Sequence, residues 1–429
     1  MVARNAPVSE LSLRFLRRRT DDGRADGRIL CDSADQMCSM DRRKKWTLAI
    51  FLFVLGDGIA VQTRGALLST FEQSFAVSES LLGLVAPAGT IGLVLTVLIV
   101  GMFSGSLDVK RFLAVGVGVT IASLLLLGTS VSYLTLLGGF LVQGVAFGVF
   151  RAFDRPLLGH LYPDQRGRIF NLYAVLWALG ATAGPLLVNV VLSLGDWRLT
   201  YLVLIVVFLP TAFLLTRLEL PAETWTEQRL TLAELRSVLR KPSVVGMVCA
   251  LVLTGGIEGT LFTWLPFYAT QFVPQSTANL LLSGFLVMYI PGRLVYSRLV
   301  SHVRSLTLIA TLAVTSLPLL FVAFVSPSPI ELSVAVLGLG LLVSGFYPTM
   351  SAFGVDALPE RSGPVNAVAV AANYVGLSVL PVVVGTLSGQ FGISTGVRVL
   401  FPAMAGVALV VVVTRFRVGG IETRTPERS

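Results

Sequence analysis

Two carboxylates lie within stretches of sequence that are otherwise almost entirely apolar. Asp57 follows Trp46 by 11 residues, Glu258 follows Val244 by 14, and each is followed directly by a glycine. A charged group inside a membrane-spanning helix costs at least about 2.5 to 3.5 kcal/mol, so it usually faces a partner or a pathway for ions or protons. We therefore predict that the two carboxylates divide the work of proton coupling and solute binding, with a purely structural buried pair as the alternative.

Arg64 distinguishes the two carboxylates. It follows Asp57 by seven residues, almost two helical turns, so the two side chains share a helix face. No basic residue lies within two turns of Glu258 in its own stretch. Because burial disfavours the charged form of a carboxyl and a nearby arginine favours it, Glu258 is predicted to carry the proton and Asp57 to stay ionised. Arg64 either binds an anionic solute or only neutralises Asp57.

Further polar side chains in the apolar stretches are candidates for binding a small solute. Trp264 and Tyr268 are four residues apart on one helix face, where they either stack on a sugar or belong to an interfacial aromatic belt. Asn373 is the strongest of the uncharged candidates, because a buried amide needs a partner or a ligand. The other uncharged candidates are Gln62, Gln143, Tyr347 and Tyr374.

Arg151, Asp154 and Arg155 follow one another at steps of three and one near the end of another apolar stretch. Residues three or four apart meet on one helix face, so Arg151 and Asp154 are predicted to form an internal ion pair. The pair either stabilises the helix or gates the inner mouth of a pathway.

These residues must be positioned by a membrane-spanning fold. The chain of 429 residues is 54% hydrophobic and 13% charged, whereas about a quarter of the residues of a soluble protein are charged. Its apolar runs approach the roughly 20 residues needed to cross a hydrocarbon core. We predict an all-α membrane protein with 12 transmembrane helices in two pseudo-symmetric six-helix bundles. The predicted spans are 46–70, 81–103, 112–130, 134–158, 169–192, 199–216, 243–270, 279–297, 305–325, 331–356, 366–388 and 396–414.

Basic residues in the loops orient the predicted spans. Eighteen Lys and Arg residues lie on the side of the amino terminus, and only two, Arg198 and Arg398, lie on the other. Since cytoplasmic loops carry the excess of such residues, both termini are predicted to be cytoplasmic, in a multi-pass protein of the plasma or inner membrane. The charges are interspersed between apolar runs, which excludes a nucleic-acid-binding face. We expect a monomer whose partners are the lipid bilayer, a small solute and protons.

Chemistry that depends on a metal or a cofactor has no support in the sequence. The cysteines Cys31, Cys38 and Cys249 and the histidines His160 and His302 show neither metal-ligand nor disulfide spacing. A phosphate-binding loop of the Gly-x4-Gly-Lys-Ser/Thr form does not occur, so ATP hydrolysis is not expected. We predict that the protein is not an enzyme and uses no cofactor.

The spans divide the chain into segments. The leader is polar and predicted to be disordered, either as a cytoplasmic tail or as sequence before a natural start at Met40. The linker contains the capping box Thr231-Leu232-Ala233-Glu234, which predicts a short amphipathic helix that lies on the membrane surface or packs on the bundle. The predicted segments are the leader 1–39, the bundles 40–216 and 243–417, the linker 217–242 and the tail 418–429.

One loop motif occurs twice. After the second span, Gly101 precedes a displaced Asp108 and the basic pair Lys110 and Arg111. The matching residues between the eighth and ninth spans are Gly292, Arg293 and Arg298. Further motif residues in and before the fifth span are Arg166, Arg168, Gly184 and Pro185. Together with the two six-span halves and the basic linker, these motifs resemble the major facilitator superfamily, whose halves are related by an axis along the membrane normal.

The resemblance implies a function as well as a fold. It predicts a secondary active transporter that moves a small polar solute, such as a sugar or an organic acid, by alternating access with proton coupling. In this family the two loops act as latches that hold the cytoplasmic face shut. The alternative is a proton-linked exporter of drugs or metabolites, because Gly180-x3-Gly184-Pro185 resembles a drug-antiporter motif, although small residues also permit close helix packing. Phe140 stands where the fourth span usually has an arginine before Gln143.

Overall fold

The protein is described by a computed structural model that covers residues 42–103, 108–218, 232–325 and 327–418. Twelve helices in these ranges are long and apolar enough to cross a membrane, which confirms the predicted fold. The leader 1–39 and Thr231 of the capping box lie outside the described residues. The spans are Arg42–Ala66, Glu79–Val97, Val109–Gly128, Tyr133–Leu161, Pro163–Leu192, Leu199–Arg217, Pro242–Ala269, Gln275–Leu299, Ser305–Phe324, Pro329–Ala357, Pro359–Phe391 and Ile393–Val418.

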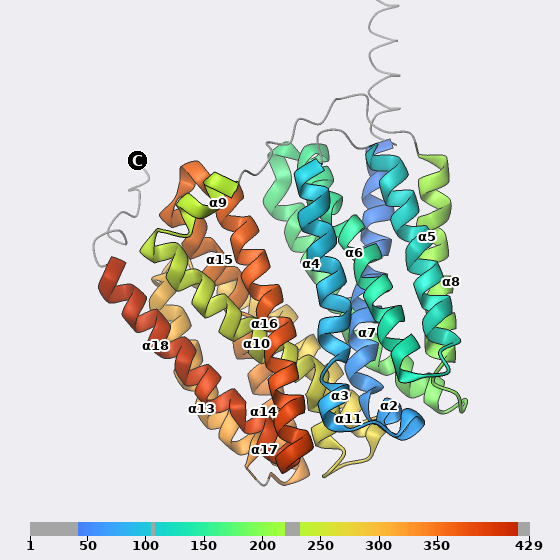
Figure 1. Cartoon of the computed structure of the whole chain (residues 1–429). Coiled ribbons are helices and arrows are strands. Elements are labelled where there is room, and N and C mark those ends of the chain that lie inside the picture. Colours follow the sequence, from blue (N-terminus) through green and yellow to red (C-terminus); the bar gives the residue numbers. More distant parts are fainter. Residues whose placement is uncertain (1–41, 104–107, 219–231, 326, 419–429) are drawn as a thin grey trace, which may run out of the picture.

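The helical elements follow one another in two series (Figure 1). After the first span, the first bundle contains α2 (Leu68–Phe75), α3 (Glu79–Leu82), α4 (Val85–Phe103), α5 (Val109–Gly128), α6 (Tyr133–Leu161), α7 (Arg166–Leu192) and α8 (Leu199–Arg217). The linker helix is α9 (Leu232–Val238). The second bundle contains α10 (Pro242–Ala269), α11 (Gln275–Val287), α12 (Tyr289–Leu299), α13 (Ser305–Phe324), α14 (Pro329–Val343), α15 (Phe346–Ala357), α16 (Ser362–Phe391), α17 (Ile393–Gly396) and α18 (Leu400–Val418).

Several helices extend a turn or more beyond the apolar runs from which they were predicted. The fifth span begins at Pro163 rather than at 169, and the eleventh begins at Pro359 rather than at 366. A helix satisfies its own backbone hydrogen bonds, so it continues through polar residues after it leaves the hydrocarbon. Side-chain caps fix other starts: Ser328 and Glu331 exchange hydrogen bonds of 2.8 and 3.3 Å at the start of α14.

Small residues set the closest helix crossings in both bundles. A Cβ at Gly180 of α7 would lie 2.1 Å from the carbonyl oxygen of Leu55 in the first span. In the second bundle, a Cβ at Gly376 of α16 would lie 2.1 Å from the carbonyl oxygen of Val252 in α10. Only glycine permits this backbone approach, so the first and fifth helices of each half form a matching pair.

The two bundles meet at one end of the molecule. We call the end that carries α9 and most of the loop Lys and Arg residues the basic end, and the opposite end the closed end. Figure 1 shows the bundles together at the closed end, near α2, α3 and α17, and apart toward α9. At the closed end, a Cβ at Gly65 would lie 1.9 Å from the carbonyl oxygen of Phe262, and one at Gly385 would lie 2.8 Å from the Cα of Gly83.

Hydrogen bonds also join the bundles toward the closed end. Asn279 of α11 donates to the Asn189 side chain of α7 at 2.8 Å, and Asn189 donates to the carbonyl oxygen of Ser276 at 2.8 Å. The Ser283 hydroxyl donates to the carbonyl oxygen of Thr182 at 2.9 Å. Because Asn279 and Ser283 are buried in this contact, separation of the bundles here would leave them unpaired or require water to enter.

Replacing Gly65 by Ala should open the closed end. The added methyl would overlap the Phe262 carbonyl, which is backbone and cannot move without displacing α10. The probe is Ser283→Cys, in a chain whose native cysteines are replaced by serine. We expect this cysteine, which is buried in the closed arrangement, to react several-fold faster with a membrane-impermeant maleimide when Gly65 is replaced by Ala than when Gly65 is kept. Gly118→Ala is the matched control, because nothing lies within 4 Å of a Cβ at that position. Equal labelling rates in the two variants would contradict the prediction.

Candidate functional site

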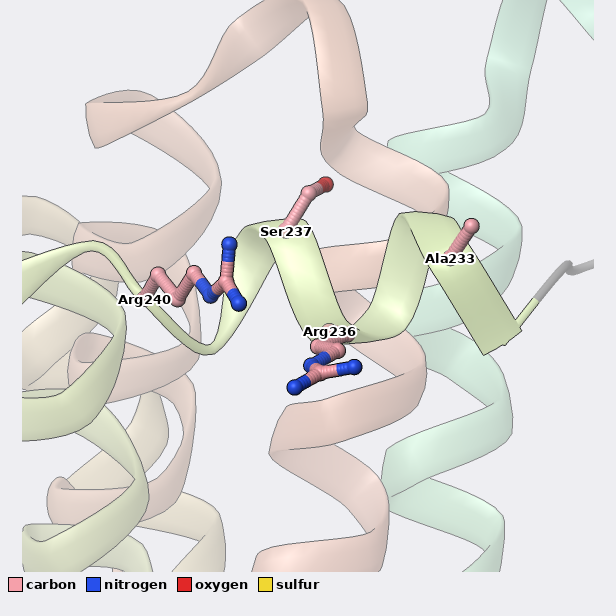
Figure 2. Close-up of a pocket in the computed structure, with 4 residues that line it drawn as sticks. All are labelled: Ala233, Arg236, Ser237 and Arg240. Carbon is pink, nitrogen blue, oxygen red and sulfur yellow. The ribbon is translucent and has the colours of Figure 1, made fainter.

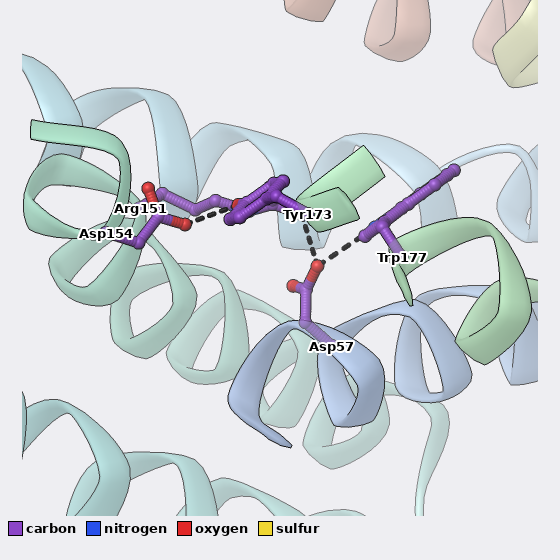
Figure 3. Close-up of polar contacts among 5 residues, drawn as sticks. All are labelled: Asp57, Arg151, Asp154, Tyr173 and Trp177. Carbon is purple, nitrogen blue, oxygen red and sulfur yellow. Dashed lines mark hydrogen bonds and ion pairs between the residues drawn. The ribbon is translucent and has the colours of Figure 1, made fainter. Parts of the chain in front are cut away.

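Asp57 in the first span is the centre of a polar cluster in the first bundle. Its carboxylate forms an ion pair with the Arg151 guanidinium of α6 and accepts a hydrogen bond of 3.1 Å from Nε1 of Trp177 on α7. Figure 3 shows Asp57 pointing away from its own helix toward these partners. The Asp57 side chain is 2% exposed, so Arg151 compensates a charge that would otherwise be buried alone.

Tyr173 of α7 joins this ion pair to Asp154. Its hydroxyl accepts a hydrogen bond from Arg151 and donates one to the Asp154 carboxylate (Figure 3). Asp154 also accepts a hydrogen bond from the backbone N–H of Arg155. The prediction that Arg151 and Asp154 form an ion pair is therefore wrong. The long Arg151 side chain reaches across the bundle to Asp57 instead, and the Tyr173 hydroxyl bridges Arg151 and Asp154.

Glu258 of α10 lies in the second bundle, on the helix that corresponds to the first span. The residue is 7% exposed, and its carboxylate accepts a hydrogen bond of 2.9 Å from the Tyr289 hydroxyl of α12. Arg293, one turn after Tyr289, lies with its guanidinium carbon 5.4 Å from the centre of the Tyr289 ring and interacts electrostatically with Glu258. No basic residue approaches Glu258 along α10, but Arg293 approaches it from a neighbouring helix.

Arg155 and Arg293 lie at the same level of the two bundles. Each is six residues from the basic end of its span, which ends at Leu161 or Leu299. Arg293 donates a hydrogen bond of 3.4 Å to the carbonyl oxygen of Ala174 on α7, so it reaches from the second bundle to the first. The two guanidinium groups are close enough to interact electrostatically. Among the described residues, no carboxylate lies within ion-pair distance of either group.

Tyr347 of α15 and Tyr374 of α16 lie near charged groups of the first bundle. The Tyr347 hydroxyl lies near Arg155, and the Tyr374 hydroxyl lies near both Arg151 and Asp57. Both tyrosines and Arg293 are half-exposed, and Arg155 is exposed. We call this set the inter-bundle cluster: Asp57, Arg151, Asp154, Arg155, Tyr173, Glu258, Tyr289, Arg293, Tyr347 and Tyr374.

Asn373, adjacent to Tyr374, packs against Gly255 of α10. A Cβ at Gly255 would lie 2.7 Å from Asn373 Oδ1, and this oxygen has no hydrogen-bond partner among the described residues. A buried amide oxygen without a donor retains unused capacity for a ligand. Asn373 therefore stays a candidate for binding.

Arg64 is buried inside the first bundle rather than between the bundles. Its guanidinium donates a hydrogen bond of 2.6 Å to Gln143 Oε1 and lies 4.9 Å from the centre of the Phe140 ring. A Cβ at Gly89 would lie 2.0 Å from Arg64 Nη1, so this glycine makes room for the guanidinium. Arg64 and Asp57 thus have different partners. The Arg64 guanidinium of the first span therefore lies beside Phe140. Phe140 stands where members of the resembled family usually have an arginine in the fourth span.

The glycine-proline element of α7 lies beside Gln62 in the first span. A Cβ at Gly184 would lie 2.7 Å from the carbonyl oxygen of Ile59 and 3.1 Å from Gln62 Cβ, and Pro185 is buried within the helix. Both amide atoms of Gln62 are buried without a hydrogen-bond partner among the described residues. Gly184 therefore permits close packing here, and Gln62 is the least satisfied of the predicted binding residues.

Trp264 and Tyr268 lie in the interior of the second bundle. Trp264 is 0% exposed and donates a hydrogen bond of 3.0 Å to the carbonyl oxygen of Pro381, and Tyr268 donates one of 3.2 Å to Ala323. Neither a solute-stacking surface nor an interfacial belt describes this arrangement. Each polar edge has a backbone acceptor, so both predicted roles are replaced by packing between helices.

The motif residues of the loops lie at or near the basic end. Asp108 caps α5: its carboxylate accepts a hydrogen bond of 3.2 Å from the backbone N–H of Arg111 and pairs with that side chain at 3.1 Å. Arg166 donates a hydrogen bond of 3.1 Å to the carbonyl oxygen of Gly159. The remaining positions are Gly101 in the last turn of α4, half-exposed Lys110, exposed Arg168 and Arg298, and buried Gly292. Their action as latches stays a prediction.

The linker helix α9 borders a hollow at the surface of the basic end. The hollow has a volume of about 350 Å³ and is lined by Ala233, Arg236 and Ser237 of α9 and by Arg240 just after it (Figure 2). Arg361 donates a hydrogen bond of 2.5 Å to the Ser237 hydroxyl, and Val238 is buried. These contacts favour packing of the linker helix on the second bundle. The hollow is separate from the inter-bundle cluster and holds none of its residues.

The sequence assigned no role to three residues of the cluster: Tyr173, Tyr289 and Arg155. The spacing of residues along α7 is a sequence signal for the first of them. Tyr173, Trp177, Gly180 and Gly184 follow steps of four, three and four, which places two polar aromatic residues on the same face of α7 as the glycines. Tyr289 and Arg293 show a step of four on α12. The exposure of Arg155 to the space between the bundles has no signal in the sequence.

The arrangement suits the binding of a polar solute and the movement of a proton. Hydroxyl, carboxylate and guanidinium groups from both bundles face one another, so a bound molecule would contact both halves. Glu258 has a hydroxyl donor but no carboxylate–guanidinium ion pair within 4 Å among the described residues, so its protonation breaks no direct ion pair. The described residues contain no group of His, Cys, Asp and Glu side chains able to hold a metal ion.

A family model for the Major Facilitator Superfamily matches residues 46–274 and 270–428. A curated relative, the uncharacterized MFS-type transporter YfiU of Bacillus subtilis (strain 168), is 30% identical over 178 residues, which are 41% of this chain and 33% of that protein. The match thus spans about a third of the relative's length.

Solved structures match over nearly the whole chain. The nucleoside transporter NupG is 12% identical with a TM-score of 0.73, over 87% of this chain and 99% of that one. A bacterial homologue of the human lysosomal transporter Spinster, inward-facing and unoccupied, is 12% identical with a TM-score of 0.71, over 90% and 99%. A D-xylose-proton symporter is 14% identical with a TM-score of 0.69, over 86% and 96%. At this identity the likeness concerns the fold.

Proposed function

Since this chain belongs to the Major Facilitator Superfamily, we propose that it is a secondary active transporter that moves a small polar solute across the cell membrane by alternating access, coupled to protons. The solute is a sugar or an organic acid. Solved proteins of the same fold include a nucleoside transporter and a D-xylose-proton symporter, which supports a small polar cargo. The protein acts as a monomer, with no cofactor.

The inter-bundle cluster carries the proposal. A solute held between Tyr347 or Tyr374 of the second bundle and Arg151 or Arg155 of the first would contact both halves, and such contacts change when the bundles rock against each other. Glu258 supplies the proton site, because it is buried and its carboxylate receives one side-chain hydrogen bond, from Tyr289, among the residues that the structure describes.

The excess of Lys and Arg at the basic end supports a cytoplasmic location for that end. On this orientation, the closed end faces outward and the described arrangement is open toward the cytoplasm. Gly65, Gly385 and the amides of α7 and α11 then form the outer gate, which must separate when the solute enters from outside.

Transport into proteoliposomes tests the proposal. Purified protein is reconstituted and given an inward proton gradient, with valinomycin and potassium to clamp the membrane potential. We expect at least one radiolabelled sugar or organic acid to accumulate above its external concentration and to leak out when the gradient is collapsed. Uptake that never exceeds the equilibrium level would contradict proton coupling, and no uptake of any polar solute would contradict the function.

The alternative is proton-linked export of drugs or metabolites. The same vesicles loaded with hydrophobic cations test it, because an exporter would move them against the proton gradient. The cluster contains Arg151, Arg155 and Arg293 together with three carboxylates, which is a poor surface for an apolar cargo. We therefore expect no movement of hydrophobic cations.

A further inference from the structure

We infer that the transported solute is a small organic anion, and that its carboxylate or phosphate group binds between Arg155 of the first bundle and Arg293 of the second. The inference deepens the proposed function, on which it rests, by naming the substrate class and two residues that recognise it.

The first argument is that neither arginine has a carboxylate partner among the described residues. Arg151 forms an ion pair with Asp57, whereas Arg155 and Arg293 have no carboxylate within ion-pair distance among the residues that the structure describes. Arg155 contacts the face of the Tyr173 ring at 5.3 Å, and Arg293 contacts that of Tyr289 at 5.4 Å and donates to one carbonyl at 3.4 Å. Most of their N–H groups remain available for a planar oxyanion, which the guanidinium fork matches.

The second argument is position. Arg155 and Arg293 lie at the same level, six residues from the basic ends of their spans, and they repel each other electrostatically. They belong to different bundles, so closure of the basic end brings two like charges closer together. An anion between them would replace repulsion by attraction in both bundles. Binding of the solute and closure of the basic end are thereby linked.

The third argument is the charge of the whole cluster. Arg151, Arg155 and Arg293 balance Asp57, Asp154 and Glu258 when all six are ionised. Protonation of Glu258 leaves one positive charge in excess, close to Arg293 and Tyr289, the groups that face this carboxyl. An anion restores neutrality at that point, so proton and anion bind better together than separately. A neutral sugar would gain nothing from this excess charge.

Matched pairs of ligands test the inference in purified protein. The probes are succinate against succinamide, and glycerol 3-phosphate against glycerol, titrated by isothermal calorimetry with thermal unfolding as a second readout. We expect binding of at least one anion and none of its neutral counterpart. Arg155→Gln should weaken anion binding about 10- to 100-fold, because a charge-assisted pair of hydrogen bonds is lost. Arg155 is exposed, so its removal should leave the fold intact.

Three further variants sharpen the result. Arg293→Gln should weaken the anion to a similar degree, and Arg155→Lys should restore part of the binding because it keeps the charge but not the fork. Glu258→Gln should tighten anion binding, since it fixes the cluster in its positively charged form. Arg417→Gln, exposed on α18, removes one positive charge elsewhere and should change nothing.

Equal binding of anionic and neutral members, or unchanged anion affinity in Arg155→Gln, would overturn the inference. So would a wild-type protein that binds none of the anions. Accumulation of a neutral probe, succinamide or glycerol, in the proteoliposomes would support the proposed transport function but would overturn the inference that the solute is an anion. A protein that transports neither class would instead overturn the proposed function.

Discussion

Glu258→Gln proteoliposomes should fail to accumulate solute in response to an imposed proton gradient, while exchange between equal concentrations on the two sides continues. Glutamine is a permanently neutral substitute of nearly the same shape as the protonated carboxyl. It can accept the hydrogen bond of 2.9 Å that Tyr289 donates, so the local packing is retained. Loss of accumulation with retained exchange separates coupling from binding, because exchange needs no net proton movement.

The physical reason lies in how each buried carboxylate is compensated. Asp57 has the Arg151 guanidinium in direct contact and the Trp177 indole as a second donor, so loss of its charge would strand Arg151. Glu258 receives one neutral hydroxyl donor, and Arg293 acts on it only at longer range. A carboxyl that is not committed to an ion pair can change its protonation state at the lower cost. We therefore expect the proton to be carried by Glu258.

Tyr289→Phe serves as the control for this experiment. It removes the hydroxyl but keeps the titratable carboxyl, so accumulation should be reduced rather than lost. Accumulation of solute by Glu258→Gln vesicles under the gradient would exclude Glu258 as the carrier and leave it a structural residue.

The fold could be predicted from the sequence because the lipid bilayer strongly constrains the composition of the spanning segments. Every spanning segment must be apolar and must satisfy its own backbone hydrogen bonds, so the 12 runs define 12 helices. The ends of the helices were harder, since caps such as Ser328 with Glu331 act after the hydrocarbon has ended. The internal repeat also placed Asp57 and Glu258 on corresponding helices.

The pairing of charges could not be derived in the same way. Spacing along one helix suggested that Asp57 pairs with Arg64 and that Arg151 pairs with Asp154. In the structure, Arg64 bonds to Gln143 and Arg151 reaches Asp57, because long side chains in a bundle choose partners on other helices. Which partner a side chain reaches depends on which helix faces meet. The spacing of residues shows which of them share a face of a helix, but not toward which neighbouring helix that face is turned.

The other large effect is expected at the ion pair in the first bundle. Asp57→Asn should destabilise the folded protein strongly, by about 3 to 5 kcal/mol, because it leaves Arg151 buried without its counter-charge. The Arg151 side chain is 16% exposed and its Nε already lacks a partner, so water cannot easily replace the lost carboxylate. The double variant Asp57→Asn with Arg151→Gln should recover much of this loss, since it removes both charges together.

Asp196→Asn is the matched control, because Asp196 and Arg198 form a pair at 3.6 Å with half of the carboxylate exposed. Exposed pairs contribute at most about 1 kcal/mol, so this variant should unfold almost as the wild type does. Chemical unfolding in detergent micelles, followed by tryptophan fluorescence, measures all four proteins. If Asp57→Asn lost no more stability than Asp196→Asn, or if the double variant were the least stable of the set, the Asp57–Arg151 pair would not be compensating a buried charge.

Recovery in the double variant would instead show that the cost lies in the stranded guanidinium. The same double variant, folded but without the pair, would then allow the contribution of Arg151 to solute binding to be measured apart from its contribution to stability.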